Sequence, residues 1–147
     1  MPLHLFISSV QKEFAAERAA LRDFLRGDAL LRRFFEPFLF EDLPAGDRRA
    51  DQVHLDKVEH CDVYVGLFGN EYGLEEGRSP THREFDLATR RHKHRLIFVK
   101  GADDRVRHPK MRALIGENLT GPLNLSAGKS PEKSPGKSPG KSRESCW

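Results

Sequence analysis

The sequence contains little cysteine and no long hydrophobic run, and both shortages narrow the classes of protein it can belong to. The two cysteines, Cys61 and Cys146, are far apart and form neither a metal-binding nor a redox spacing. His92 and His94 lack a third ligand, so we predict no metal site. No apolar run approaches the length of a membrane helix, and no signal-peptide pattern begins the chain. We therefore expect a cytoplasmic protein that has no membrane partner.

Tyrosine and tryptophan are also scarce, with two Tyr and one Trp against ten Phe. This balance favours a packed core over a broad aromatic surface for nucleic acid. The net charge of +3 is carried by residues 126–147, which hold five basic and two acidic side chains. The rest of the chain has 20 basic and 20 acidic side chains, so its charge gives no reason to expect a polyanionic partner. We do not expect the folded body to bind nucleic acid.

The length of 147 residues suits one domain. From Ser126 onward, Lys-Ser recurs every four residues between prolines and glycines, and this repeat has no apolar side chain to bury. We predict one α/β domain over residues 1–120 and a disordered basic tail over residues 121–147.

Apolar runs alternate with segments of helical periodicity along the domain. Strands are predicted at Leu3–Ile7, Phe38–Phe40, Val63–Phe68 and Leu96–Val99. Helices are predicted at Val10–Leu25, at Val53–Cys61, from Pro80 onward and at Pro109–Ile115, with a short helix or a wide loop at residues 30–35. This alternation is typical of βαβ units, so we predict a parallel sheet with the first strand in a central position.

The segment after the third predicted strand is the best candidate for a functional site. The strand ends at Gly69, and the next helix begins at Ser79-Pro80, a capping hydroxyl followed by a proline suited to the first helical position. Open α/β sheets bind ligands at the carboxyl ends of their strands. We therefore expect Glu84, one turn into this helix, to lie over a ligand-binding crevice.

Three segments together resemble a bacterial TIR-like domain of unknown function, a distant relative of TIR domains and nucleoside deoxyribosyltransferases. They are Phe6–Phe14 with the following Glu17-Arg18, Gly66–Gly73 and Ser79–Phe85, and the resemblance spans about Leu3 to Leu114. It implies a flavodoxin-like three-layer fold with strand order 2-1-3-4. It also implies an N-terminal module of larger regulator, helicase-like or ATPase proteins. In active relatives a glutamate on the matching helix acts on the ribose of NAD or a nucleoside, and Glu84 occupies that position.

The chain departs from this family after residues 109–111, where relatives continue with another strand and helix. Either this is a naturally short version or the C-terminus has diverged or been truncated. An incomplete sheet edge would favour a homo-oligomer.

The proposed chemistry assigns roles to several candidate residues, with Ser8 and Ser9 at the end of the first strand holding a phosphate or ribose. Glu84 would stabilise the positive charge that develops on ribose as an N-glycosidic bond breaks. Tyr72 would stack a base, and an arginine after the second strand would pair with a diphosphate. The candidate ligand-binding residues are Ser8, Ser9, Asp47, Arg48, Gly69, Tyr72 and Ser79.

Each role has a structural alternative. Thr81–Glu84 also fits a capping box, in which Glu84 accepts a hydrogen bond from a backbone amide at the helix start. Tyr72 can pack against its own loop, Ser8 and Ser9 can form a turn, and His82 is interpreted as a surface residue.

Two main functions follow, beside a third hypothesis of nucleic-acid association through the basic tail. The first is a nucleotide- or NAD-binding module of signalling or defence, with N-glycosidase activity on NAD or nucleosides as a further hypothesis. The second is a non-catalytic assembly or sensor domain of a regulatory protein, such as a transcriptional regulator. In both, NAD or a nucleotide is a substrate or ligand, and no separate cofactor is expected.

Deleting residues 126–147 should leave the midpoint of thermal unfolding nearly unchanged, because the repeat has no apolar side chains to pack on the domain. Thermal unfolding of the full and shortened chains, followed by circular dichroism, tests this. A drop of many degrees would show that the tail packs on the domain.

Overall fold

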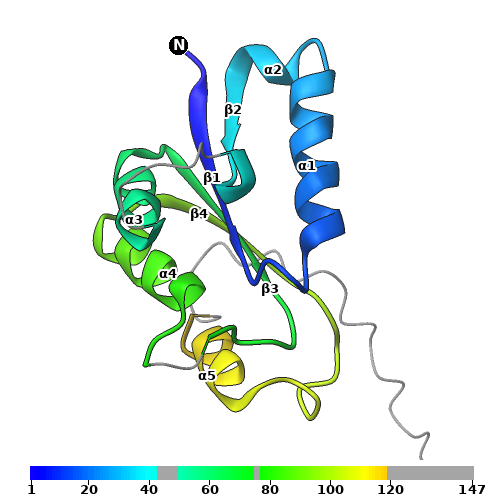
Figure 1. Ribbon diagram of the computed structural model, residues 1–147, viewed down its shortest axis with the longest axis vertical. Helices are drawn as coiled ribbons and strands as arrows, with labels where there is room; N and C mark the ends of the chain where they lie inside the picture. The colour runs from blue at the N-terminus through cyan, green and yellow to red at the C-terminus, as the bar shows by residue number, and fades with distance from the viewer. Residues whose placement is uncertain (43–49, 75–76, 119–147) are drawn as a thin grey trace, which may run out of the picture.

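A computed structural model describes residues 1–42, 50–74 and 77–118, which form a three-layer α/β domain (Figure 1). Its sheet is four-stranded and all parallel, and the strand order is β2-β1-β3-β4. The strands are β1 (Leu3–Ser9), β2 (Phe35–Phe38), β3 (Val63–Phe68) and β4 (His94–Val99). The predicted order 2-1-3-4 and the central position of the first strand are therefore confirmed.

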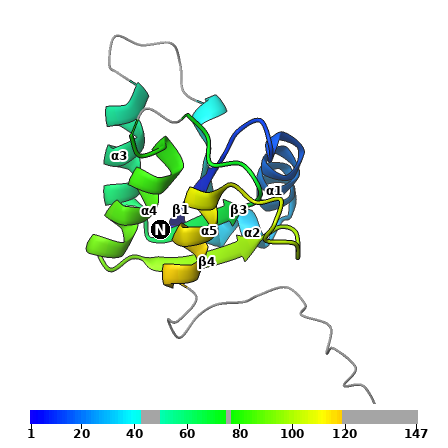
Figure 2. The same ribbon diagram turned by 90° about the horizontal axis from the view of Figure 1, so that it is seen from below.

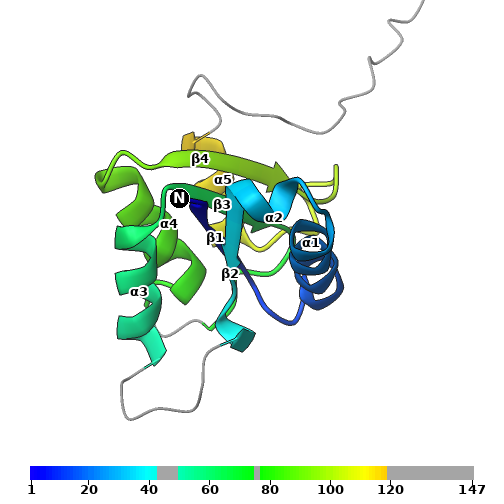
Figure 3. The same ribbon diagram turned by 90° about the horizontal axis from the view of Figure 1, so that it is seen from above.

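Helices cover both faces of the sheet. The helices α1 (Ala15–Gly27) and α2 (Leu31–Phe34) lie on one side, as seen from above and below (Figures 2 and 3). The helices α3 (Ala50–His60) and α4 (Pro80–Arg90) lie on the other side. The last helix, α5 (Pro109–Asn118), packs into the core on the α3 and α4 side. None of the helices in the described ranges is long and apolar enough to cross a membrane.

Alternation along β1 divides the core into two clusters. Leu5 and Ile7 point toward α1, whereas Phe6 points toward α3 and α4. Successive side chains of a strand face opposite sides of a sheet, so a strand buried on both faces reads as a nearly continuous apolar run. The larger cluster consists of Phe6, Val58, Cys61, Tyr64, Phe68, Tyr72, Phe85, Ala88, Met111, Leu114 and Ile115.

The second strand begins and ends earlier than its prediction at Phe38–Phe40. It spans Phe35–Phe38 and pairs in register with β1, from Leu3 opposite Phe35 to Phe6 opposite Phe38. Pro37 belongs to this strand, which its position at the sheet edge allows. The chain then turns at once into a short 3-10 helix, η1 (Phe40–Asp42). Leu39, which follows the last residue of β2, is buried in the core, so the apolar run in the sequence extends beyond the strand.

The other edge of the sheet is β4, beyond which no strand is found within the described ranges. Leu96 and Phe98 on this strand are 38% and 42% exposed. In register they lie opposite Val65 and Leu67, on the face of the sheet that α1 partly covers. This apolar edge is considered again below.

Gly66 and Gly116 form a matched pair for testing how tightly the sheet packs. A Cβ at Gly66 would lie 2.9 Å from Ile97 Cδ1 and 3.1 Å from Tyr64 Cε1, whereas a Cβ at Gly116, in α5, meets nothing within 4 Å. We expect Gly66→Ala to lower the free energy of unfolding by about 1–3 kcal/mol through overpacking. Gly116→Ala should raise it by up to about 1 kcal/mol, because alanine favours the helix.

Urea unfolding of both variants tests this difference. Equal effects at the two glycines would contradict the close packing described for β3.

Candidate functional site

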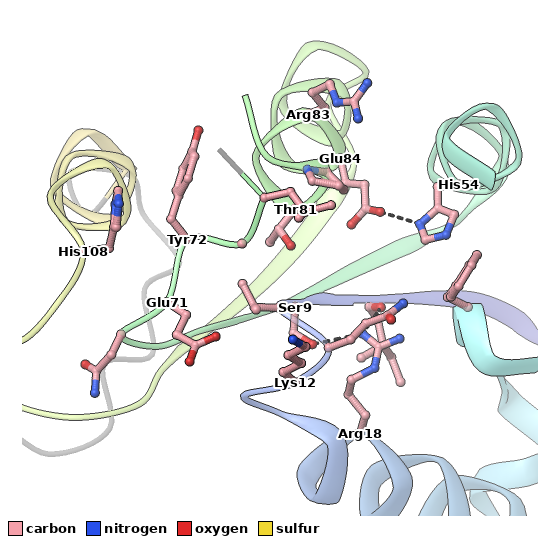
Figure 4. Close-up of a pocket in the computed structure, with 18 of the residues that line it drawn as sticks. Ser9, Lys12, Arg18, His54, Glu71, Tyr72, Thr81, Arg83, Glu84 and His108 are labelled. Atoms are coloured by element: carbon pink, nitrogen blue, oxygen red, sulfur yellow. Dashed lines mark hydrogen bonds and ion pairs between the residues drawn. The ribbon is translucent and has the colours of Figure 1, made fainter. Parts of the chain in front are cut away.

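A cavity of about 1200 Å³ opens at the carboxyl end of the sheet. Its walls come from the segments that follow β1, β2 and β3, from the loop after β4, and from α3 and α4 (Figure 4). This is the location where open α/β sheets bind their ligands. Three predicted site residues line the cavity directly, namely Ser9, Tyr72 and Glu84.

The remaining predicted residues fall into two groups. Ser8, Gly69 and Ser79 are buried next to the cavity without lining it. Asp47 and Arg48 lie outside the described residues. Within the described ranges, no cluster of three His, Cys, Asp or Glu side chains is placed to hold a metal ion.

The start of α4 leaves Glu84 available for another role. The Ser79 hydroxyl accepts a hydrogen bond from the backbone amide of His82 at 3.2 Å, and Pro80 occupies the first helical position. Ser79 is therefore the cap, as its sequence context indicates. The carboxylate of Glu84 is bonded to other partners, so the capping-box alternative does not describe this helix.

Glu84 carries a buried carboxylate, with the whole residue only 4% exposed. The Ser8 hydroxyl, at the end of β1, donates to Glu84 Oε2 at 2.5 Å. His54 Nδ1, from α3, lies 2.6 Å from Glu84 Oε1 (Figure 4). A buried charge is costly unless it is paired and hydrogen-bonded, and these two contacts provide that compensation. Three separate elements thus fix one carboxylate at the cavity wall.

The order of these contacts differs from that of a serine hydrolase. In a catalytic triad the serine hydroxyl is bonded to the histidine, and the acid lies behind the histidine. Here Ser8 donates directly to Glu84, and His54 contacts the other carboxylate oxygen. The carboxylate of Glu84 lines the cavity, whereas Ser8, which donates to it, does not.

His54 is a site residue that sequence reasoning missed. It lies in α3, and its ring packs against Phe40 of η1 with ring centroids 4.4 Å apart. No local motif marks it, because its contact with Glu84 joins residues 30 positions apart. Only the packing of α3 against α4 brings them together.

Arg18 was part of the family resemblance but had no assigned role. It is 3% exposed, and its guanidinium donates to the carbonyl of Ile7 at 3.1 Å and to the hydroxyl of Ser9 at 3.0 Å. Its other nitrogens bind both carboxylate oxygens of Glu41 at 2.9 Å. The hydrogen bond from Arg18 is the main cause that lowers the pKa of Glu41. Ser9 therefore accepts a hydrogen bond from Arg18, and Arg18 connects the end of β1 to Glu41 in η1.

Gly69 allows a close approach by another side chain. The carboxylate of Glu13 accepts hydrogen bonds from the amides of Asn70 at 2.6 Å and Glu71 at 3.0 Å. A Cβ at Gly69 would overlap this carboxylate. The buried guanidinium of Arg107 binds the carbonyl of Gly69 at 3.1 Å from another direction. The loop after β3 is therefore held from two sides.

Tyr72 packs into the protein more fully than its predicted stacking role requires. It is 3% exposed, its hydroxyl lies 2.7 Å from His82 Nδ1, and its ring stacks on His108 at 5.4 Å. His82, interpreted from the sequence as a surface residue, is instead half-buried by this contact. The interpretation of His82 as a surface residue was wrong because Tyr72 packs over the start of α4 and covers part of the His82 ring.

Tyr64 lies under the same corner of the sheet. It is fully buried, and within the described part of the chain its hydroxyl makes no hydrogen bond of normal geometry, although the Ser8 side chain lies close enough to interact with it. Burial raises the pKa of the phenol well above its usual value, and the negative charge of Glu84 raises it further. The hydroxyl of Tyr64 therefore stays protonated beneath the site.

The contact between Glu13 and the loop at Gly69 can be measured by a double-mutant cycle. Glu13→Ala removes the acceptor of two amides and should cost about 1–3 kcal/mol of unfolding free energy. Gly69→Ala displaces the same carboxylate, so the double variant should lose clearly less than the two single losses added together.

Gly27→Ala is the control, because a Cβ there meets nothing within 4 Å. Its effect should simply add to that of Glu13→Ala in urea unfolding. Additivity of Gly69→Ala with Glu13→Ala would refute the described contact.

Comparison with solved structures finds chains of similar architecture. A 2-desoxiribosyltransferase from Leishmania mexicana superposes with a TM-score of 0.51 and 17% sequence identity, over 68% of this chain and 66% of that one. The chain therefore spans just under two thirds of that enzyme. A CMP N-glycosidase from Clostridium botulinum is similar at a TM-score of 0.43 and 14% identity, over 84% of both chains. The first of these comparisons shows a shared fold.

Sequence comparison gives a more direct assignment. No protein with a curated description matches the chain. A domain family described as "Domain of unknown function (DUF4062)" matches residues 4–124, which include all of the sheet except Leu3, the residues around Glu84 and α5. By this match over most of its length, the chain belongs to the DUF4062 family of domains of unknown function.

Proposed function

We propose that the domain binds a nucleoside or nucleotide in the cavity at the strand ends and cleaves its N-glycosidic bond. One observation carries this proposal: the buried Glu84 carboxylate lines the cavity and is fixed by Ser8 and His54. In the reaction the bond between C1′ and the base nitrogen breaks and its electron pair leaves with the base, while water adds to C1′ as a hydroxyl and gives up one proton. The base of a neutral nucleoside takes up that proton, whereas the nicotinamide of NAD leaves as a neutral molecule and the proton passes to the solvent. NAD and simple nucleosides both contain such a bond.

The position of the carboxylate suits this chemistry. Positive charge develops on the ribose ring as the base departs, and a fixed negative charge beside it lowers the barrier. Ser8 and His54 hold both oxygens in place before the ligand arrives, so little reorganisation is needed. A carboxylate oxygen can accept more than one hydrogen bond, which leaves capacity for the ribose hydroxyls.

The shared fold supports the same class of ligand. The Leishmania mexicana protein is named as a desoxiribosyltransferase, an enzyme class that acts on the bond between a sugar and a base. The reaction and its ligand rest on the geometry of Glu84. The role in signalling or defence rests on the resemblance to TIR-like domains.

A second candidate function is a non-catalytic assembly or sensor domain. It is favoured by the apolar edge at Leu96 and Phe98. Three further apolar side chains are exposed: Phe24 on α1, Phe34 on α2 and Leu30 between these helices. Exposed apolar patches often mark interfaces between proteins. Sedimentation of the purified domain at several concentrations separates the two, because an assembly domain forms larger species as the concentration rises.

Glu84→Gln keeps the shape of the side chain and removes its charge. We expect it to reduce release of nicotinamide from NAD, or of base from nucleosides and nucleotides, by about 100-fold or more. Its midpoint of thermal unfolding should stay close to that of the native chain. Glu84→Ala should also lose activity, and it should cost about 1–3 kcal/mol because Ser8 and His54 lose their partner.

Asp86→Asn is the matched control. Asp86 lies on the same helix two residues away and pairs with Arg78 at the surface, outside the cavity lining. Chromatography of the released bases should show unchanged turnover for this variant. Full turnover by Glu84→Gln, or no cleavage of any of these compounds by the native chain, would refute the glycosidase proposal and leave the assembly domain.

A further inference from the structure

The aromatic ring expected to stack a base is already occupied by the protein. Tyr72 is stacked on His108, its ring also meets His82 edge-on at 5.8 Å, and Lys110 Nζ lies 5.4 Å from the ring centroid. Its hydroxyl is hydrogen-bonded as well. A ligand base would have to displace these contacts to reach it. The base subsite must therefore be sought elsewhere in the cavity.

Another aromatic pair lines the same cavity on the opposite side of Glu84 from Tyr72. Phe40 and His54 are both half-buried, both line the cavity, and their rings pack at 4.4 Å with a tilt of 45°. In Figure 4, His54 and Tyr72 lie on opposite sides of the Glu84 carboxylate. Phe6 completes this wall from β1, edge-on to His54 at 6.4 Å, but it is itself almost fully buried.

We propose that Phe40 and His54 form the subsite for the nucleobase. This inference rests on the proposed function and adds to it a place for the base. His54 contacts both Phe40 and the carboxylate of Glu84, so the aromatic wall directly adjoins the group assigned to the ribose. In an N-glycoside the base is bonded directly to C1′, so its subsite must adjoin the carboxylate that faces C1′. Tyr72 is not needed for this arrangement.

The wall is held rigidly before any ligand binds. Nδ1 of His54 is fixed by Glu84 at 2.6 Å, which sets the orientation of the ring. Phe40 begins η1, whose next two residues are anchored to α1: Glu41 by the two-fold contact with Arg18, and Asp42 by Arg26 at 2.7 Å. A stacking platform of fixed side chains loses little conformational freedom when a base binds.

The subsite also has a chemical preference. Stacking of a base on an aromatic ring is tolerant of base identity, since every base has a π-face. We therefore expect purine and pyrimidine nucleotides to bind through the same ring. The ligand class is a compound with an aromatic base on C1′ of ribose, as opposed to a sugar phosphate alone.

The test compares adenosine 5′-monophosphate with ribose 5-phosphate, which lacks the base, by isothermal titration calorimetry. Phe40→Leu keeps an apolar side chain of similar bulk but removes the ring. We expect it to weaken binding of adenosine 5′-monophosphate by about tenfold or more, while binding of ribose 5-phosphate changes little. Phe40→Tyr should restore binding, because it keeps an aromatic face.

Phe24→Leu provides the matched control, since Phe24 is 62% exposed on α1 and does not line the cavity. It should bind both compounds as the native chain does. Thermal unfolding of each variant shows whether the domain is still folded. If Phe40→Leu fails to fold, Phe40→Met, which also removes the ring and keeps an apolar side chain, takes its place with the same expected loss.

Three results would overturn the subsite. These are unchanged binding of adenosine 5′-monophosphate to Phe40→Leu, equal loss of binding for both compounds, and no binding of the nucleotide to the native chain at millimolar concentration. Failure of the proposed cleavage is a separate result: base-dependent binding without turnover would leave the subsite in place and refute only the glycosidase.

Discussion

The architecture of the site depends on one buried carboxylate that joins three elements. Glu84 reaches from α4 to the end of β1 through Ser8 and to α3 through His54. A carboxylate that is 4% exposed would be costly without these partners. Its position also determines the surrounding chemistry. The cavity wall at this point carries a fixed charge, next to a half-buried aromatic pair and above a buried tyrosine hydroxyl.

The loops around this carboxylate are held by two further charged side chains, the half-buried Glu13 and the buried Arg107. Glu13 binds the amides after β3, and Arg107 binds the carbonyls of Gly69, Lys100 and Gly101. Loops that carry functional groups are usually the mobile parts of a domain. The hydrogen bonds of Glu13 and Arg107 restrict the motion of the loops after β3 and β4. They fix the rim of the cavity while the parallel sheet fixes its floor. Both kinds of support favour a site that is formed before the ligand arrives.

The fold could be read from the sequence because it follows from local patterns. Apolar runs and helical periodicity predicted a parallel sheet with the first strand in a central position, and the family resemblance added the strand order 2-1-3-4. Ser79-Pro80 located the start of α4 correctly. The second strand was misplaced because Leu39 is a core residue beyond the end of the strand. Patterns of burial alone do not separate a strand from the turn that follows it.

The site was only partly readable because its contacts join distant residues. Glu84 could be singled out from its position on a helix after a strand, but its partners Ser8 and His54 lie 76 and 30 residues away. Tyr72 looked like a ligand-stacking residue because its loop lies at the strand end, whereas tertiary packing against His82 and His108 occupies its ring. The spacing of residues along the sequence does not predict these tertiary contacts.

The most direct test of the central claim is a crystal structure of Glu84→Gln bound to adenosine 5′-monophosphate. The substitution keeps the shape of residue 84, and under the proposed mechanism it prevents turnover, so the intact nucleotide can be seen. The account predicts that C1′ of the ribose lies in contact with residue 84 and that the adenine lies against Phe40. A nucleotide bound outside this cavity, or with its ribose turned away from residue 84, would contradict it.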